Sequence, residues 1–330
     1  MSQELRAPLV GLGNKHQVTD LIWQRFGSVN AYIEPFAYTA SVALANPAPS
    51  RLKHEIINDH NGFVTNFWRS IKYSYNETAF YSDMPLSTLD FVASERRLLH
   101  DYPDLVDKLR EDIHYHDPIL AGLWAYYIAL SIDIGRHLHI GEYTGASQTV
   151  SVGKGVSLGR KSVPFYTGSF VDDDEWRLSG DRLTEWFKAL SMRLRDVQIF
   201  NKDWKDLFSD SMLAHSTKKE PTDPKDYKYT AIFFDPPYAD AAHKGKTYTN
   251  EQIGIHKTVM LKAIDLAKDR FNRIIVCGYE NDHTTPSGWT KEVWKGDGIR
   301  LGGQQKQEYS RAEAIWCSPS CVYEEQLGLL

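Results

Sequence analysis

The residues best suited to chemistry are Asp235, Pro236, Pro237 and Tyr238, which directly follow the apolar run at residues 231–234. Such a run is typical of a strand buried in a parallel sheet, and ligands of open α/β sheets bind beyond the carboxyl ends of these strands. The two prolines supply no N–H donor and fix φ, so the turn presents acceptors, namely the Asp235 carboxylate and the Pro236 carbonyl. Together these can hold both hydrogens of an exocyclic amino group, while Tyr238 offers a ring face to a flat base. The alternative interpretation is a plain turn after a strand.

Strands and helices alternate along the chain around this turn. Strands are predicted from apolar runs, and helices from apolar residues spaced three or four apart. The predicted strands are residues 30–34, 54–59, 197–200, 229–234 and 273–278, with a late antiparallel strand at 313–317, and the predicted helices are 62–73 and 256–271. This alternation indicates an α/β fold with a doubly wound, Rossmann-like sheet that is mostly parallel and has one late antiparallel strand.

A stretch of different character interrupts the predicted sheet. Residues 86–134 are helix-like, and residues 140–178 are rich in glycine. We therefore predict a sheet domain formed by residues 1–85 and 180–330, and an inserted region at 86–179. The glycine-rich part carries Lys154, Arg160 and Lys161, a combination that suits close approach to a phosphate backbone, although a solvated loop is an equal alternative.

Composition limits the possible classes of function. The 330 residues include 38 Lys and Arg against 43 Asp and Glu, a formal net charge of −5. This excludes a uniformly basic nucleic-acid coat, but not a basic groove on an acidic body. The three cysteines, Cys277, Cys317 and Cys321, form no CxxC motif, which favours a reducing cytoplasm without a disulfide scaffold or a metal site. The apolar run at 119–134 is too short for a membrane span, so no membrane partner is expected.

Four segments carry a resemblance to a known family. Asp-Pro-Pro-Tyr at 235–238 resembles the motif of amino-methyltransferases that use S-adenosylmethionine. Residues 8–15 resemble an N-terminal Gly-Gly-Lys motif, 32–42 a Glu-Pro-Phe cofactor loop, and 55–62 an Asn-Asp segment, in that order. Residues 197–203 resemble the next cofactor motif. Together these segments resemble the DNA adenine methylase (Dam-like) family of N6-adenine DNA methyltransferases, in which the insertion carries target recognition.

The resemblance implies roles for individual residues. Catalysis falls to residues 235–238, with Asp235 and the Pro236 carbonyl binding the amino group. The implied DNA-binding residues are Lys154, Arg160 and Lys161, and no metal is implied. The implied cofactor-binding residues are Gly11, Gly13, Lys15, Glu34, Pro35, Phe36, Ala37, Asp59 and Asp203.

Physical arguments bear on four of these roles. Amides of the turn after Glu34 can bind the methionine carboxylate of the cofactor, and Glu34 itself its ammonium group. Asp59 suits a ribose diol, with a helix N-cap as the alternative. Asp203 suits the adenine amino group of the cofactor, and it could equally cap a helix. Lys15 suits the cofactor or a phosphate, with a plain exposed lysine as the alternative.

Two segments depart from the family pattern. In the N-terminal loop the paired glycines are split by Leu12, and Asn14 precedes Lys15; the cofactor loop lacks glycine. The chain has Ala37, Tyr38, Thr39 and Ala40 where family members usually carry glycines, and glycine is normally needed where φ is positive or the backbone approaches a ligand.

The resemblance implies methyl transfer from S-adenosylmethionine to a flipped adenine of DNA, by a monomer or weak dimer in a bacterial or phage-infected cytoplasm. The alternatives are a catalytically silent DNA-binding module and a methyltransferase acting on guanine amino groups of RNA.

Overall fold

The computed structural model describes residues 5–9, 15–84, 87–134, 180–209, 212–213, 227–238, 254–295 and 312–323. The chain divides into two compact units. Unit 1 comprises Met1–Gly11 and His60–Asn201, and unit 2 comprises Leu12–Asp59 and Lys202–Leu330. Each unit is described by itself.

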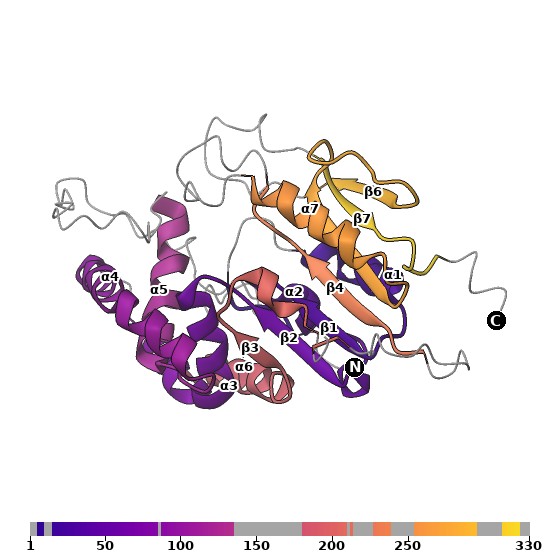
Figure 1. Ribbon diagram of the computed structural model, residues 1–330. Coiled ribbons are helices and arrows are strands. Elements are labelled where there is room, and N and C mark those ends of the chain that lie inside the picture. Colours follow the sequence, from indigo (N-terminus) through magenta and orange to yellow (C-terminus); the bar gives the residue numbers. More distant parts are fainter. Residues whose placement is uncertain are drawn as a thin grey trace. The chain divides into compact units, whose positions relative to one another are not determined.

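A mixed sheet forms the centre of unit 2 (Figure 1). Its strands are β1 (Ala31–Glu34), β2 (His54–Asn58), β4 (Thr230–Phe234), β5 (Asn272–Tyr279), β6 (Thr290–Lys295) and β7 (Ala312–Cys317). They are hydrogen-bonded in the order β2-β1-β4-β5-β7-β6. The first four are mutually parallel, whereas β7 runs antiparallel to both β5 and β6. This arrangement confirms the predicted Rossmann-like α/β fold.

The late antiparallel strand was predicted correctly, but one strand of the sheet was missed. Among the strands of unit 2 described here, β7 is the one that runs against the others. The unpredicted β6 pairs with it along its whole length and so runs in the same direction as β5. The sequence of β6 is Thr-Lys-Glu-Val-Trp-Lys, and Val293 on it is 47% exposed. An edge strand with so little buried side-chain surface lacks the apolar run by which buried strands are recognised.

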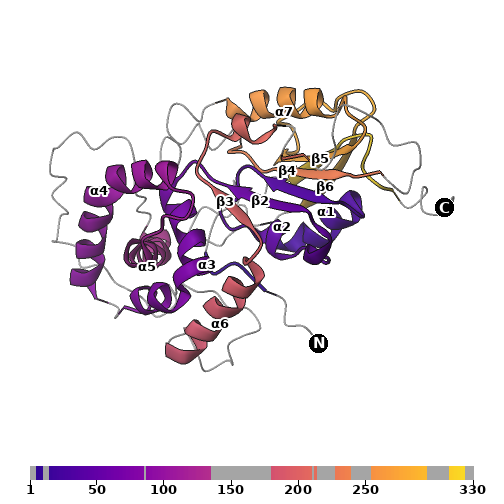
Figure 2. The same cartoon turned by 60° about the horizontal axis from the view of Figure 1, so that its bottom comes forward.

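Helices lie on both faces of this sheet. In Figure 2, α7 (Ile255–Leu266) lies on one face, while α1 (Thr19–Phe26) and the short α2 (Ser41–Leu44) lie on the other. The indole nitrogen of Trp23 donates to the carbonyl oxygen of Val42 at 2.8 Å and so joins α1 to α2. β4 is buried along its whole length, as expected for a strand covered on both faces.

Unit 1 is mainly helical, with α5 (Pro118–Ile134) lying between α3 (Gly62–Ser82) and α4 (Thr88–Glu111) in Figure 2. It also contains α6 (Gly180–Arg193) and the strand β3 (Gln198–Phe200). α3 extends beyond the predicted end at residue 73, because the helix resumes after a kink at Ser74. α3 and α5 approach closely at Gly122, where a Cβ atom would lie 2.5 Å from the Cβ atom of Tyr81.

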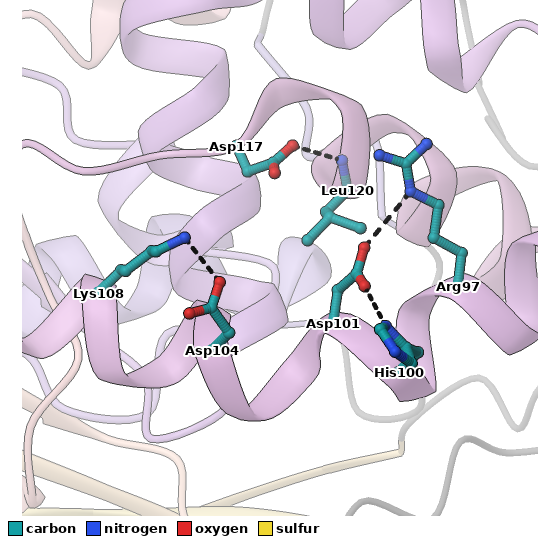
Figure 3. Close-up of polar contacts among 7 residues, drawn as sticks. All are labelled: Arg97, His100, Asp101, Asp104, Lys108, Asp117 and Leu120. Carbon is teal, nitrogen blue, oxygen red and sulfur yellow. Dashed lines mark hydrogen bonds and ion pairs between the residues drawn. The ribbon is translucent and has the colours of Figure 1, made fainter.

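Buried and exposed polar groups of unit 1 serve different purposes. Arg69 on α3 is 1% exposed and donates to four main-chain carbonyls, those of Ile199, Leu109, Asp112 and Tyr115. Buried backbone acceptors need such partners. On α4, by contrast, the ion pairs drawn in Figure 3 are exposed, and pairs of this kind contribute little to stability.

Figure 3 also shows how α5 begins. The side chain of Asp117 accepts the amide of Leu120 at 2.9 Å, and Pro118 follows at the first helical position. This is a favoured N-terminal cap.

The borders of the two units fall at residues 60 and 201, whereas the sequence analysis placed domain borders at 85 and 180. The difference arises because α3 packs with α4, α5 and α6 in unit 1. The role of residues 86–179 in target recognition stays a prediction.

Among the described residues, none of the helices has both the length and the apolar composition of a membrane span.

Candidate active site

Asp235 lies directly after β4, at the carboxyl edge of the parallel strands, and its side chain is 21% exposed. The hydroxyl of Tyr238 donates to its Oδ1 atom at 3.0 Å. The ring of Tyr238 packs edge-on against Tyr279 of β5, with ring centroids 4.8 Å apart. The turn at 235–238 therefore folds back on itself and is braced by the neighbouring strand.

Lys15 reaches the same carboxylate from the N-terminal part of unit 2. It immediately precedes the short 3-10 helix His16–Val18, and its backbone carbonyl accepts the amide of Val18. The Nζ atom lies 3.1 Å from Asp235 Oδ2 and 5.1 Å from the centre of the Tyr238 ring. With a side chain 4% exposed, Lys15 is not the plain exposed lysine of the alternative interpretation.

Glu313 on β7 completes the group and was not predicted from the sequence. Its Oε2 atom lies 3.3 Å from Lys15 Nζ and 3.2 Å from the hydroxyl oxygen of Tyr238. The backbone register places Glu313 opposite Tyr279 of β5. Lys15, Asp235, Tyr238 and Glu313 thus form one connected set of polar groups, called here the Asp235 cluster.

For Asp235 and Lys15, the charge of the partner shifts the pKa in the direction opposite to the effect of burial. Burial raises the pKa of Asp235, and the neighbouring ammonium of Lys15 acts in the opposite direction. Burial alone would lower the pKa of Lys15, but Asp235 and Glu313 together raise it above its ordinary value. Burial, followed by the charge of Asp235, raises the pKa of Tyr238 well above 10. Lys15 is therefore a cation and Tyr238 a neutral donor at neutral pH, and both stabilise the charge of Asp235.

Glu34 ends β1 at the same edge and is 3% exposed. Its Oε2 atom accepts the hydroxyl of Tyr32 at 2.8 Å and the amide of Ala43 at 3.2 Å. Burial raises the pKa of Glu34 to about 8, although both hydrogen bonds act against this. With this pKa the carboxyl group is mostly protonated at neutral pH, and a bound cation would favour its ionised form.

The turn after Glu34 keeps a glycine-like backbone without glycine. φ is 32° at Tyr38 and 49° at Ala40, in the left-handed region that non-glycine residues rarely adopt. Pro35, Phe36 and Ala37 begin this turn. The fold thus retains the conformation that glycines would favour, at a cost in backbone strain.

The amides of this turn already have partners within unit 2. The amide of Ala37 donates to the carbonyl oxygen of Asn58, that of Tyr38 to Asp59 Oδ2 at 3.0 Å, and that of Ala40 to the carbonyl oxygen of Ala37. A ligand carboxylate that used these three amides would have to displace those bonds.

The remaining candidate cofactor residues lie just after β1, β2 and β3 in the chain. Asp59 follows β2, and the cap of α3 is Asn61 rather than Asp59. Asp203 is exposed and caps the 3-10 helix η4 (Trp204–Leu207) by accepting the amide of Lys205. Trp204 lies between the rings of Phe36, at 5.7 Å, and Phe234, at 6.1 Å. Acidic groups beside aromatic rings suit a ligand that combines an ammonium, a ribose and an adenine.

The structure brings together only part of the predicted site. Lys15, Asp235 and Tyr238 are in contact, and the buried Pro236 lies between the last two. Several predicted residues lie outside the described part of the chain: Gly11, Gly13, Lys154, Arg160 and Lys161. Within the described residues, no three His, Cys, Asp or Glu side chains are grouped so that they could hold a metal ion.

The fold and the acidic turn after β4 are consistent with a Rossmann-like methyltransferase. Residues 12–119 match the family described as D12 class N6 adenine-specific DNA methyltransferase. This match is consistent with the Dam-like resemblance and indicates a DNA adenine methyltransferase. It ends before Asp235 and Glu313, so their roles rest on geometry. None of the curated proteins matches the chain significantly.

Proposed function

We propose that the chain transfers a methyl group from S-adenosylmethionine to the N6 amino group of an adenine that has flipped out of DNA. The observation that carries this proposal is the Asp235 carboxylate, held by Lys15 and Tyr238 at the carboxyl edge of the parallel strands. Ligands of such sheets bind at this edge. An adenine within a duplex cannot reach a site of this kind, so flipping is required, at a few kcal/mol.

In this proposal, residues of unit 2 bind the amino group and stabilise its developing charge. Asp235 and the Pro236 carbonyl accept the two N6 hydrogens, which directs the nitrogen lone pair away from them. The negative charge of Asp235 stabilises the positive charge that develops on the nitrogen. Because the ammonium of Lys15 sustains its ionised form, Asp235 serves mainly as an acceptor, and the proton leaves after transfer.

S-adenosylmethionine, when bound, supplies a methyl group whose bond to sulfur is replaced by a bond to the N6 nitrogen. Glu34 holds its ammonium group, Asp59 its ribose, and Asp203 with the rings of Phe36 and Trp204 its adenine. Residues 86–179, including Lys154, Arg160 and Lys161, recognise the DNA target. We infer a cytoplasmic enzyme of a bacterium or phage.

The test is transfer of labelled methyl groups to genomic DNA, followed by mapping of the methylated base. The wild type should label adenine N6. Asp235→Asn should reduce labelling by about 100-fold or more, while Asp265→Asn on the exposed face of α7 should leave it unchanged.

Two outcomes would support the alternatives. DNA binding without labelling would favour the silent DNA-binding module. Labelling of guanine in ribosomal RNA in place of DNA would favour the RNA methyltransferase.

A further inference from the structure

Both oxygens of Asp235 are engaged within the protein. Oδ2 lies 3.1 Å from Lys15 Nζ, and Oδ1 accepts the hydroxyl of Tyr238 at 3.0 Å. The proposed function requires this carboxylate to accept a hydrogen of the amino group. Each carboxylate oxygen has two lone pairs, so the hydrogen of the amino group would share an oxygen with Lys15 or Tyr238 and would compete with that donor for its charge.

Glu313 is the side chain that can receive both partners. Its Oε2 atom lies within 3.3 Å of Lys15 Nζ and 3.2 Å of the Tyr238 hydroxyl oxygen. The hydroxyl has one hydrogen, so a small rotation of its O–H bond transfers the hydrogen bond from Asp235 to Glu313 without moving the ring. Lys15 has three hydrogens and can strengthen its bond to Glu313 in the same way.

The backbone holds Glu313 in place for this exchange. Residue 313 lies between Tyr279 of β5 and Trp294 of β6 in the antiparallel register. Its side chain is 16% exposed, so water competes little for its oxygens. A second acceptor fixed on a strand can take over the two donors at small cost in conformational entropy.

We propose that Glu313 is a positioning residue, which takes over the hydrogen bonds of Lys15 and Tyr238 and thereby frees Asp235 to bind the amino group. This inference rests on the proposed function. Glu313 itself touches neither the substrate nor the cofactor in this scheme.

A second consequence concerns charge. The negative charge of Glu313 raises the pKa of Asp235, since like charges disfavour ionisation. Removing it should lower that pKa. The acidic limb of the pH profile of kcat should then move to lower pH, which a merely structural role of Glu313 would not cause.

The experiment compares Glu313→Gln with the wild type in methyl transfer to DNA. We expect kcat to fall about 10- to 100-fold, the KM values for DNA and cofactor to change less than twofold, and the acidic limb to shift to lower pH. The matched control is Glu280→Gln, whose side chain is 44% exposed and outside the Asp235 cluster. It should leave kcat and the profile unchanged.

Glu313→Asp keeps the charge with a shorter reach, and it provides a second test if Glu313→Gln folds poorly. It should lower kcat while leaving the acidic limb near its wild-type position. An active wild type with unchanged kcat and pH profile in both variants would overturn the role of Glu313 alone. A wild type that methylates neither DNA nor RNA would overturn the proposed function and, with it, this inference.

Discussion

The ammonium nitrogen of Lys15 lies 3.1 Å from Oδ2 of Asp235, although most of the chain separates the two residues. The lysine side chain is 4% exposed and has Glu313 as a second carboxylate partner. One buried cation therefore compensates two carboxylates. Removing one member of such a set leaves an unbalanced buried charge, which is more damaging than losing a surface ion pair.

Lys15→Met should destabilise unit 2 by about 3–5 kcal/mol at pH 8. Without the cation, which holds the pKa of Asp235 down against the effect of burial, the folded-state pKa of Asp235 rises further. A raised carboxyl pKa contributes stability that is present at low pH and is lost as pH rises through it. Urea unfolding at pH 5 and pH 8 should therefore show a smaller loss at pH 5, and Glu313→Gln in the Lys15→Met background should restore part of the loss at pH 8. An equal loss at both pH values would contradict the charge argument.

Tyr238 combines a ring face with a hydroxyl, and two variants separate them. Tyr238→Phe removes the hydrogen bonds to Asp235 and Glu313 and should lower kcat/KM on DNA about 10-fold. Tyr238→Ala also removes the ring and should cost about another 10-fold if the base stacks there. Tyr227→Phe, which lies outside the Asp235 cluster, serves as the control. Equal losses in the two Tyr238 variants would assign the role to the hydroxyl alone.

Glu34 should release a proton when the cofactor binds. Burial raises its pKa to about 8, so the carboxyl group is mostly protonated at pH 7, and an ammonium group beside it favours ionisation. Calorimetry of S-adenosylmethionine binding at pH 7, in buffers of different ionisation enthalpy, should show net proton release by the wild type. Glu34→Gln should abolish that release. Identical proton release in the two proteins would exclude Glu34 as the source.

Substitution of Ala40 by glycine tests whether the turn after β1 is strained. With φ at 49°, Ala40→Gly should relieve about 1 kcal/mol of strain, offsetting the loss of one buried methyl group, so that the free energy of unfolding changes by less than about 1 kcal/mol. Ala43→Gly is the matched control, because Ala43 is equally buried but lies in α2. There the same change should cost about 1–2 kcal/mol. Urea unfolding of both variants measures the difference, and equal costs would show that Ala40 is unstrained.

The acidic turn was predictable because its signals are local. The apolar residues before Asp235 indicate a buried strand, and Pro236 and Pro237 end it, so the location of the turn depends on no distant part of the chain. The same holds for β1 and β2, whose structural bounds lie within one residue of the prediction.

Glu313 was not predictable in this way. Its place in the Asp235 cluster depends on the register of β7 against β5, and register is set by pairing between distant strands rather than by local residue type. β6 was missed for a related reason, because an edge strand does not need a continuous apolar run. The positive φ values at Tyr38 and Ala40 are a third case, since the tertiary fold imposes them on residues that do not favour them.

The Asp235 cluster joins residues 15, 235 and 313, and this long sequence separation determines when the cluster can form during synthesis. A nascent chain on the ribosome has no complete cluster until β7 has been synthesised and has paired with β5. Contacts of such long sequence separation form late in folding. Activity should thus appear only after β7 has been synthesised, and truncated products that end before β7 should not methylate DNA.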